Sequence, residues 1–139
     1  MKIGIDDSGI IQRWVETCLD CPSLGPAVSF FVEKNDQLLA GITLYNYTKN
    51  DIHIAVYATT PRFLTRTLMA NVFGYCFDQL QVDRITTTVQ VSNSHANRFN
   101  QRIGFVKEGR VRRAISGEDA VLYGMLREDC RWLKGVSNG

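Results

Sequence analysis

The chain has 139 residues, of which 45% are hydrophobic and 22% charged, and its formal net charge is +2 at pH 7. This length predicts a single domain over residues 1–139 that buries roughly two thirds of its unfolded surface. No apolar run approaches the roughly twenty residues that span a bilayer, and the early pair Asp6 and Asp7 argues against a secretion signal. These features exclude a membrane-spanning or secreted protein and predict a cytoplasmic one.

The distribution of charge and the spacing of the cysteines indicate which ligands to expect. Residues 61–139 carry twelve basic and seven acidic groups, which favours an anionic ligand, with a solvated basic surface as the alternative. Basic and aromatic residues do not interleave as in a stacking module, so we do not expect a nucleic-acid partner. Cys18 and Cys21 form a CxxC motif, but no second pair of ligands follows at the spacing of a zinc site, and we predict no metal.

The N-terminal segment predicts a short strand followed by an amphipathic helix. The strand covers residues 1–5 and the helix runs near 9–19, with Asp6, Asp7 or Ser8 as its N-cap. The expected buried side of this helix consists of Ile10, Ile11, Trp14, Val15 and Cys18. A loop follows at 22–26.

Three strands are predicted next. Alternating apolar and polar residues favour strands over 27–33, 38–47 and 52–59. The short polar connections between them, 34–37 and 48–51, are typical of antiparallel hairpins.

The strongest helix signal covers residues 61–80. Thr60 is placed to act as N-cap and Pro61 as first helical residue, which fixes the entry into the helix. A strand that leads into a helix N-terminus presents free N–H groups and a positive dipole end, so we expect a phosphate site there, with Arg62 and Arg66 adding charge. The predicted apolar face consists of Leu64, Leu68, Val72, Phe73, Cys76, Phe77 and Leu80.

The C-terminal half predicts a strand over 84–91, a helix over 94–103 that ends at Gly104, and two strands over 105–113 and 120–127. The helix between the strands 52–59 and 84–91 makes these two parallel through a right-handed crossover. The sequence therefore predicts an α+β fold with a mixed, mostly antiparallel sheet of six or seven strands flanked by helices.

A family resemblance rests on the run Asn-Ser-His-Ala-Asn-Arg-Phe-Asn-Gln-Arg-Ile-Gly-Phe at 93–105 and the run Glu-Gly-Arg-Val-Arg at 108–112. Both resemble the last quarter of GNAT N-acetyltransferases, in particular the branch that acetylates ribosomal-protein N-termini. The run Pro-Arg-Phe-Leu-Thr-Arg at 61–66 is similar to phage-borne GNAT-like proteins. The resemblance implies a GNAT-like fold, splayed between the fourth and fifth strands, with acetyl-CoA as co-substrate and an amine acceptor as partner.

The resemblance also implies the site residues. The catalytic candidates are His53 as base and Tyr57 on the same strand face. The cofactor-binding candidates are Ala58, Arg62, Leu64, Thr65, Arg66, Thr67, Asn93, Asn97 and Asn100. Some of these candidates also have a purely structural interpretation. His53 would be a half-buried or surface histidine on a strand, Tyr57 would only pack against its neighbours, and Asn93 and Asn97 would cap the helix.

Three positions depart from the family pattern. The segment 61–66 has no glycine where the family has a glycine-rich loop, Asn100 stands where a tyrosine often protonates the leaving thiolate, and Ala96 stands where the ribosomal-protein branch often has a serine. Two functions therefore stay open. One is an acetyl-CoA-dependent N-acetyltransferase acting on a protein N-terminus, a lysine or a small amine. The other is a non-catalytic GNAT-like binding module of phage type. A homodimer is left open in either case.

Overall fold

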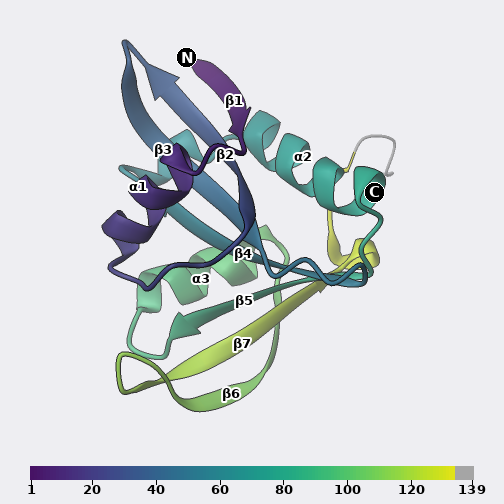
Figure 1. The fold of residues 1–139 in the computed structure, drawn as a ribbon. Coiled ribbons are helices and arrows are strands. Elements are labelled where there is room, and N and C mark those ends of the chain that lie inside the picture. Colours follow the sequence, from purple (N-terminus) through teal and green to yellow (C-terminus); the bar gives the residue numbers. More distant parts are fainter. Residues whose placement is uncertain (134–139) are drawn as a thin grey trace.

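The computed structural model describes residues 1–133, which form a seven-stranded sheet with three α-helices (Figure 1). The strands are β1 (Lys2–Asp6), β2 (Ala27–Lys34), β3 (Gln37–Tyr45), β4 (Asp51–Ala58), β5 (Arg84–Gln90), β6 (Val106–Ile115) and β7 (Glu118–Leu126). The helices are α1 (Ile10–Leu19), α2 (Arg66–Gly74) and α3 (Ser94–Ile103). Short 3-10 turns lie at Pro61–Phe63 and Arg127–Asp129, and a turn of π-helix lies at Tyr75–Gln79.

The strand order is β1-β2-β3-β4-β5-β7-β6, and the pairing is antiparallel except between β4 and β5. Two tight turns set this order locally. Asn35 and Asp36 join β2 to β3, and Ser116 and Gly117 join β6 to β7, each pair with both φ angles positive. Such two-residue turns match the twist of a hairpin. The predicted mixed, mostly antiparallel α+β fold is confirmed.

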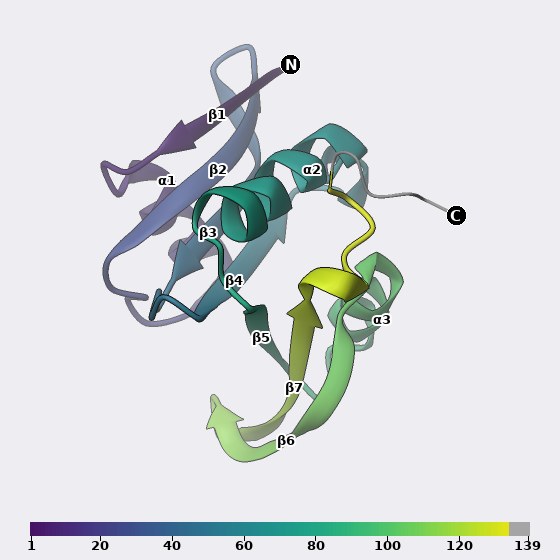
Figure 2. The same ribbon diagram turned by 90° about the vertical axis from the view of Figure 1, so that its right-hand side faces the viewer.

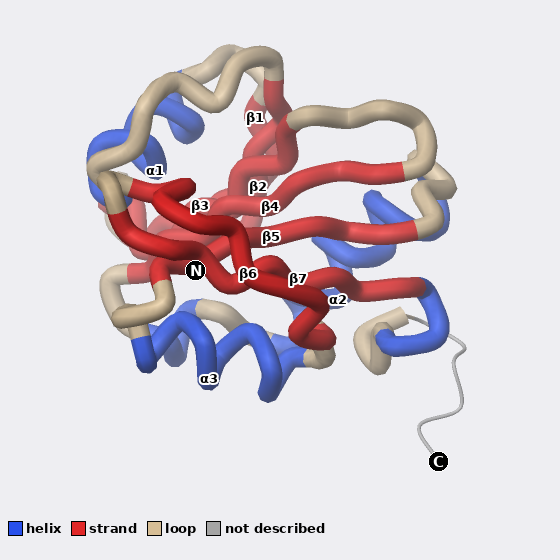
Figure 3. Tube along the Cα trace, turned by 90° about the horizontal axis from the view of Figure 1, so that it is seen from below, coloured by secondary structure: helices blue, strands red, loops and turns tan. Residues whose placement is uncertain are grey.

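The helices cover the two faces of the sheet unequally. α1 packs on one face, and α2 and α3 lie on the other, as Figure 2 shows with α1 at the left and α2 and α3 at the right. On the α1 face, Gly41 of β3 has no side chain, which lets Val15 and Ile11 of α1 approach its backbone closely. α3 is fixed to the half of the sheet containing β5 and β7, where β5 lies between β4 and β7 (Figure 3).

The main core lies between the sheet and α2. Side chains at alternate positions of β2, β3 and β4 point to this face and meet the apolar side of α2. Its fully or nearly fully buried members include Val32, Ile42, Leu44, Leu68, Val72, Phe73, Cys76 and Ile85. Burial of this stripe, more than helix propensity, holds α2 in place.

Two expectations for α1 are wrong. Ile10 is 61% exposed and Cys18 is exposed, whereas Ile11 and Val15 are buried. Ile10 lies about 100° around the helix from Ile11 and so misses the sheet. Cys18 belongs to the last turn, which is exposed beyond Val15. The expected N-cap at Asp6, Asp7 or Ser8 is wrong as well, because Gly9, with φ of 93°, is the N-cap.

The predicted continuous helix over 61–80 is also wrong, because the segment is divided into three pieces. Pro61 starts only a 3-10 turn, and Leu64, with φ of −86° and ψ of 70°, interrupts the helical path. α2 then starts at Arg66 with Thr65 as N-cap, and it ends at Gly74 before the π-helical turn. The hydroxyl of Thr60 makes no capping hydrogen bond.

Candidate active site

β4 and β5 pair over a short stretch and then separate. Their parallel register ends where His53 lies opposite Thr86. Just beyond, the Thr87 hydroxyl donates to the Ile54 carbonyl oxygen at 3.0 Å. Past this point, within the described residues 1–133, the two strands form no further backbone pairing (Figure 1). Main-chain groups on the two facing edges are therefore available to an extended ligand. The predicted splay between the fourth and fifth strands is confirmed.

The N-terminus of α2 follows β4 and offers free amides. The Thr65 Oγ1 accepts a hydrogen bond from the Leu68 amide at 3.2 Å, and the Thr65 carbonyl accepts one from the Met69 amide at 2.9 Å. The amides of Arg66 and Thr67 precede the first intrahelical hydrogen bond and have no acceptor within the helix. These two amides and the positive dipole end can bind a phosphate.

Two arginines bring positive charge to the same segment. The Arg62 guanidinium lies over the Phe63 ring, 5.1 Å from its centroid, and the Arg66 guanidinium lies over the Trp132 ring at 5.7 Å. Both arginines are exposed. A guanidinium stacked on a ring keeps its N–H edge free for an anion, so both can add to the site at the amides of α2.

The predicted contacts Ala58 and Leu64 are half-buried and pack against the core. Ala58 is paired with Ala40 of β3, and the Leu64 amide donates to the Pro61 carbonyl at 3.0 Å. The Leu64 amide is therefore occupied, and the free amides of this segment, those of Arg66 and Thr67, come later in the chain than a cradle starting at Pro61 would have them.

The asparagines at the start of α3 use their side chains inside the protein. Asn93 is the N-cap and accepts a hydrogen bond from the Ala96 amide at 3.1 Å. The Asn97 Nδ2 donates to the carbonyls of Asn93 at 2.8 Å and Gln90 at 3.1 Å, and its Oδ1 accepts from the Tyr123 hydroxyl at 2.6 Å. Burial raises the pKa of Tyr123, so its hydroxyl stays protonated and can donate. These bonds tie α3 to the end of β5 and to Tyr123 within β7.

Two buried polar atoms near the separated strands have no partner. Within residues 1–133, these are the Thr60 Oγ1, just after β4, and the Asn100 Nδ2, on the helix that follows β5. Asn100 is only 8% exposed. A buried amide without a partner costs about 1–3 kcal/mol, which is recovered when a ligand supplies the missing acceptor.

His53 and Tyr57 lie on the α1 face of β4 but do not meet. The His53 side chain is 30% exposed, its Nε2 is 3.4 Å from the Asp51 Oδ2, and its ring lies 5.5 Å from the Tyr45 ring. Tyr57 makes an edge-on contact with Trp14 of α1 at 5.4 Å between centroids. Four residues along a strand separate the two candidates by about 13 Å, so they serve different parts of the site.

Four polar side chains that link His53 across the sheet to β6 were missed at the sequence level: Asp51, Arg84, Thr86 and Glu108. The one available signal was that Asp51 precedes His53 by two residues and so shares its strand face. Thr86 hydrogen-bonds to Asp51, and Arg84 to Glu108. The first contact depends on the register between β4 and β5, and the second on the registers of β5 and β6 with β7, none of which the sequence shows.

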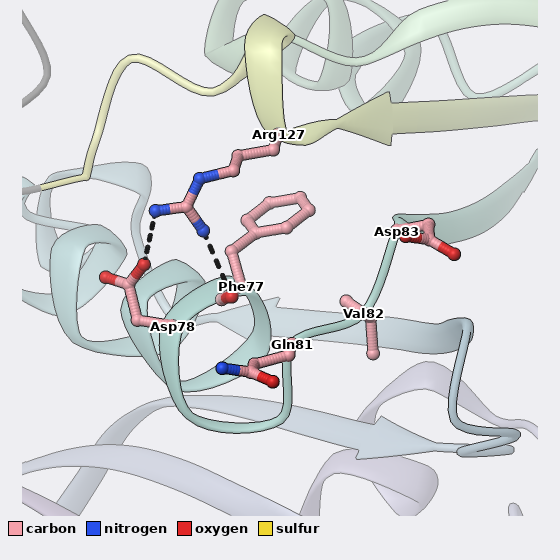
Figure 4. A pocket seen from close by; sticks show the side chains of 6 residues that line it. All are labelled: Phe77, Asp78, Gln81, Val82, Asp83 and Arg127. Carbon is pink, nitrogen blue, oxygen red and sulfur yellow. Dashed lines mark hydrogen bonds and ion pairs between the residues drawn. The ribbon is translucent and has the colours of Figure 1, made fainter.

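A surface pocket of about 410 Å³ lies elsewhere, at the opposite end of β5 (Figure 4). Its lining residues are Phe77, Asp78, Gln81, Val82, Asp83 and Arg127. The Arg127 guanidinium donates to the Asp78 carboxylate at 2.6 Å and to the Phe77 carbonyl at 3.0 Å. Because its lining lies before and at the start of β5, and not at the end where β4 and β5 separate, this pocket is not part of the candidate site.

The described residues show neither a metal-binding cluster nor a membrane-spanning helix. Within residues 1–133, no three His, Cys, Asp or Glu side chains gather to hold a metal ion, and no helix is long and apolar enough to cross a membrane. The four cysteines are free thiols.

Comparison with known proteins identifies the family. The model of the Acetyltransferase (GNAT) family matches residues 8–105. The SPbeta prophage-derived uncharacterized N-acetyltransferase YokL of Bacillus subtilis (strain 168) is 29% identical over 68 residues, covering 46% of this chain and 38% of YokL. The chain thus matches well under half the length of this curated relative.

Solved structures agree in fold. A dodecameric structure of spermidine N-acetyltransferase from Vibrio cholerae has a TM-score of 0.73 at 15% identity, covering 91% of this chain and 94% of that one. A probable acetyltransferase has a TM-score of 0.66 at 21% identity, covering 88% and 72%. At such identities the likeness establishes the GNAT fold, while the family model covers well over half of the sequence. The chain belongs to the acetyltransferase (GNAT) family.

Proposed function

We propose that the chain is an acetyl-CoA-dependent N-acetyltransferase, formed by a single GNAT domain over residues 1–139. The observation that carries this proposal is the position of the free amides of Arg66 and Thr67 at the helix that follows β4, whose pairing with β5 ends at His53. The similarity to YokL and to a spermidine N-acetyltransferase supports an amine as acceptor. A small amine, a lysine or a protein N-terminus fits this class.

Acetyl-CoA supplies the activated acetyl thioester. The amides of Arg66 and Thr67, with the guanidinium groups of Arg62 and Arg66 and the Thr65 main chain, would bind the pyrophosphate. The unpaired edges of β4 and β5 would hydrogen-bond the pantetheine amides. The residues fit such a group because the Thr60 hydroxyl and the Asn100 amide, on the two segments after these strands, are buried without partners. Asn93 and Asn97 fix the start of α3 and thereby the position of Asn100.

The acceptor must react as a neutral amine, so a base has to remove its proton. His53 is the base in this proposal, because it lies at the last paired position of β4 and is accessible at 30% of its side-chain surface. The Asn100 amide would donate a hydrogen bond to the oxygen or sulfur that gains charge. Tyr57 would form the wall of the acceptor site through its contact with Trp14.

A specific observation favours the non-catalytic alternative. Asn100 offers an amide where the family often has a proton-donating tyrosine, and the segment 61–66 has no glycine. An amide cannot protonate a thiolate, so catalysis requires water for that step. A phage-type binding module would keep the fold and lack turnover. A cytoplasmic location and a homodimer stay predictions under both functions.

The test is calorimetric titration of acetyl-CoA and CoA into wild-type protein and Arg66→Glu. Replacing a charged contact to a phosphate costs about 1.5–3 kcal/mol, so we expect binding to weaken about ten- to a hundredfold in the variant. Arg112→Glu is the matched control, since Arg112 is exposed on β6 and makes the same charge change.

Binding that is equally weakened by both variants would show only a net-charge effect and would contradict the assigned pyrophosphate site. Acetyl transfer across a panel of small amines, lysine peptides and N-terminal peptides then separates the two functions. Tight binding of acetyl-CoA without transfer to any of these acceptors would favour the non-catalytic module.

A further inference from the structure

We infer that Asp51 is a positioning residue for His53, held in place by a chain of polar contacts that crosses the sheet to Glu108. This inference rests on the proposed acetyl transfer and names a group that acts through the base. It concerns the α1 face at the point where β4 and β5 stop pairing.

Asp51 uses its two carboxylate oxygens for two partners. Its Oδ1 accepts a hydrogen bond from the Thr86 hydroxyl at 2.7 Å, and its Oδ2 lies 3.4 Å from the His53 Nε2. On the neighbouring strand, the Tyr45 ring lies against the imidazole, tilted by 56°. The carboxylate and the ring together restrict the orientation of the imidazole, as a base in a rigid site requires.

The chain continues from Thr86 to the far side of β7. The Arg84 Nε donates to the Thr86 Oγ1 at 3.0 Å, and the Arg84 Nη2 donates to the Glu108 Oε1 at 2.7 Å. The carboxylates and guanidinium are only 27–32% exposed, so solvent screens them incompletely. Thr86 bonds to Asp51, Arg84 bonds to Thr86, and Glu108 bonds to Arg84, so these contacts hold the Asp51 side chain in one rotamer.

Gly124 of β7 makes this arrangement fit. A Cβ atom at Gly124 would collide with the Arg84 Nη2 and the Glu108 carboxylate. The ion pair therefore lies directly across the glycine, over the backbone of β7, which separates β5 from β6. The absence of a side chain at Gly124 therefore leaves room for the Arg84–Glu108 pair beside the short stretch where β4 and β5 pair.

The arrangement has a chemical consequence. The Asp51 carboxylate, 3.4 Å from Nε2, favours the tautomer with its proton on that nitrogen, which leaves the Nδ1 lone pair for the acceptor. As the amine nitrogen forms its bond to the acetyl carbon, the amine proton moves to Nδ1, the carbon–sulfur bond breaks, and the thiolate leaves and takes a proton from water. Asp51 stabilises the imidazolium that is formed.

The experiment is a double-mutant cycle on the acetyl-transfer reaction with Asp51→Ala, His53→Gln and the double variant. We expect Asp51→Ala to lower kcat about tenfold or more with little change in KM, and the double variant to be no slower than His53→Gln alone. Asp83→Ala is the matched control, because Asp83 bonds to Asn50 at the same end of β5 and does not contact His53. We expect it to keep wild-type kcat.

A second readout does not depend on turnover. Nitrogen chemical shifts of the His53 ring should report one tautomer, protonated at Nε2, in the wild type and a mixture in Asp51→Ala. If Asp51→Ala is not folded, Thr86→Val tests the same contact by removing the hydroxyl that fixes Asp51. Effects of Asp51→Ala and His53→Gln that add in full, or an unchanged tautomer, would overturn the inference. A wild type without turnover would remove the proposed function, and with it the catalytic role of Asp51.

Discussion

Thr65, and not Thr60, should behave as the N-cap of α2. The Thr65 Oγ1 accepts from the Leu68 amide at 3.2 Å, and replacing a threonine N-cap by alanine typically costs about 1 kcal/mol. For a chain of this size, that loss lowers Tm by about 3–5 °C. The Thr60 Oγ1 is buried without a partner, so Thr60→Ala removes no hydrogen bond and should change stability by less than about 0.5 kcal/mol.

The assay is urea unfolding followed by circular dichroism, with Thr65→Ser as the control that keeps a capping hydroxyl. We expect wild type, Thr60→Ala and Thr65→Ser to unfold at similar urea concentrations, with Thr65→Ala lower and all four m-values equal. If Thr60→Ala is destabilised as much as Thr65→Ala, the helix starts at Pro61 and the free amides assigned to Arg66 and Thr67 are not at its terminus.

Two further predictions concern packing and thiol chemistry. Gly124→Ala should lower the free energy of unfolding by about 1 kcal/mol or less, because its methyl group meets the flexible ends of the Arg84 and Glu108 side chains and displaces their ion pair, whereas Gly109→Ala, whose added methyl group meets no atom within 4 Å, should have no measurable effect in the same urea titration. Burial raises the pKa of Cys76 to about 12, so at pH 8 only about one in ten thousand of these thiols is ionised. Maleimide should therefore label the exposed Cys18 in native protein and Cys76 only in denaturant; mass spectrometry showing native labelling of Cys76 would contradict its burial.

Local patterns were sufficient for most of the fold. The alternation in 84–91 and the polar turns at 34–37 and 48–51 need only neighbouring residues to act, and β5 and the hairpins β2–β3 and β3–β4 form there. The parallel pairing of β4 with β5 also followed from the sequence, because a helix between two adjacent strands requires a crossover.

The division of the segment 61–80 could not be predicted in the same way. Thr60 and Thr65 both precede residues compatible with a helix, and Pro61 favours the first of them by its fixed φ. The choice is made by tertiary packing, since Phe63 and Leu64 lie against the core and the helical path is interrupted between them and Thr65. A helix propensity averaged over the segment does not contain that information.

The candidate site depends on the same long-range choices. Strand alternation places His53 on the α1 face, while α2 and α3, which carry the free amides and Asn100, lie on the opposite face. In the proposed reaction, an amine beside His53 and a thioester held from the other face can therefore meet only where the sheet is not closed by β4–β5 hydrogen bonds. His53 is the last residue of that pairing. The position at which the pairing ends, and not the presence of a histidine, thus decides whether a base on β4 can reach the acetyl group.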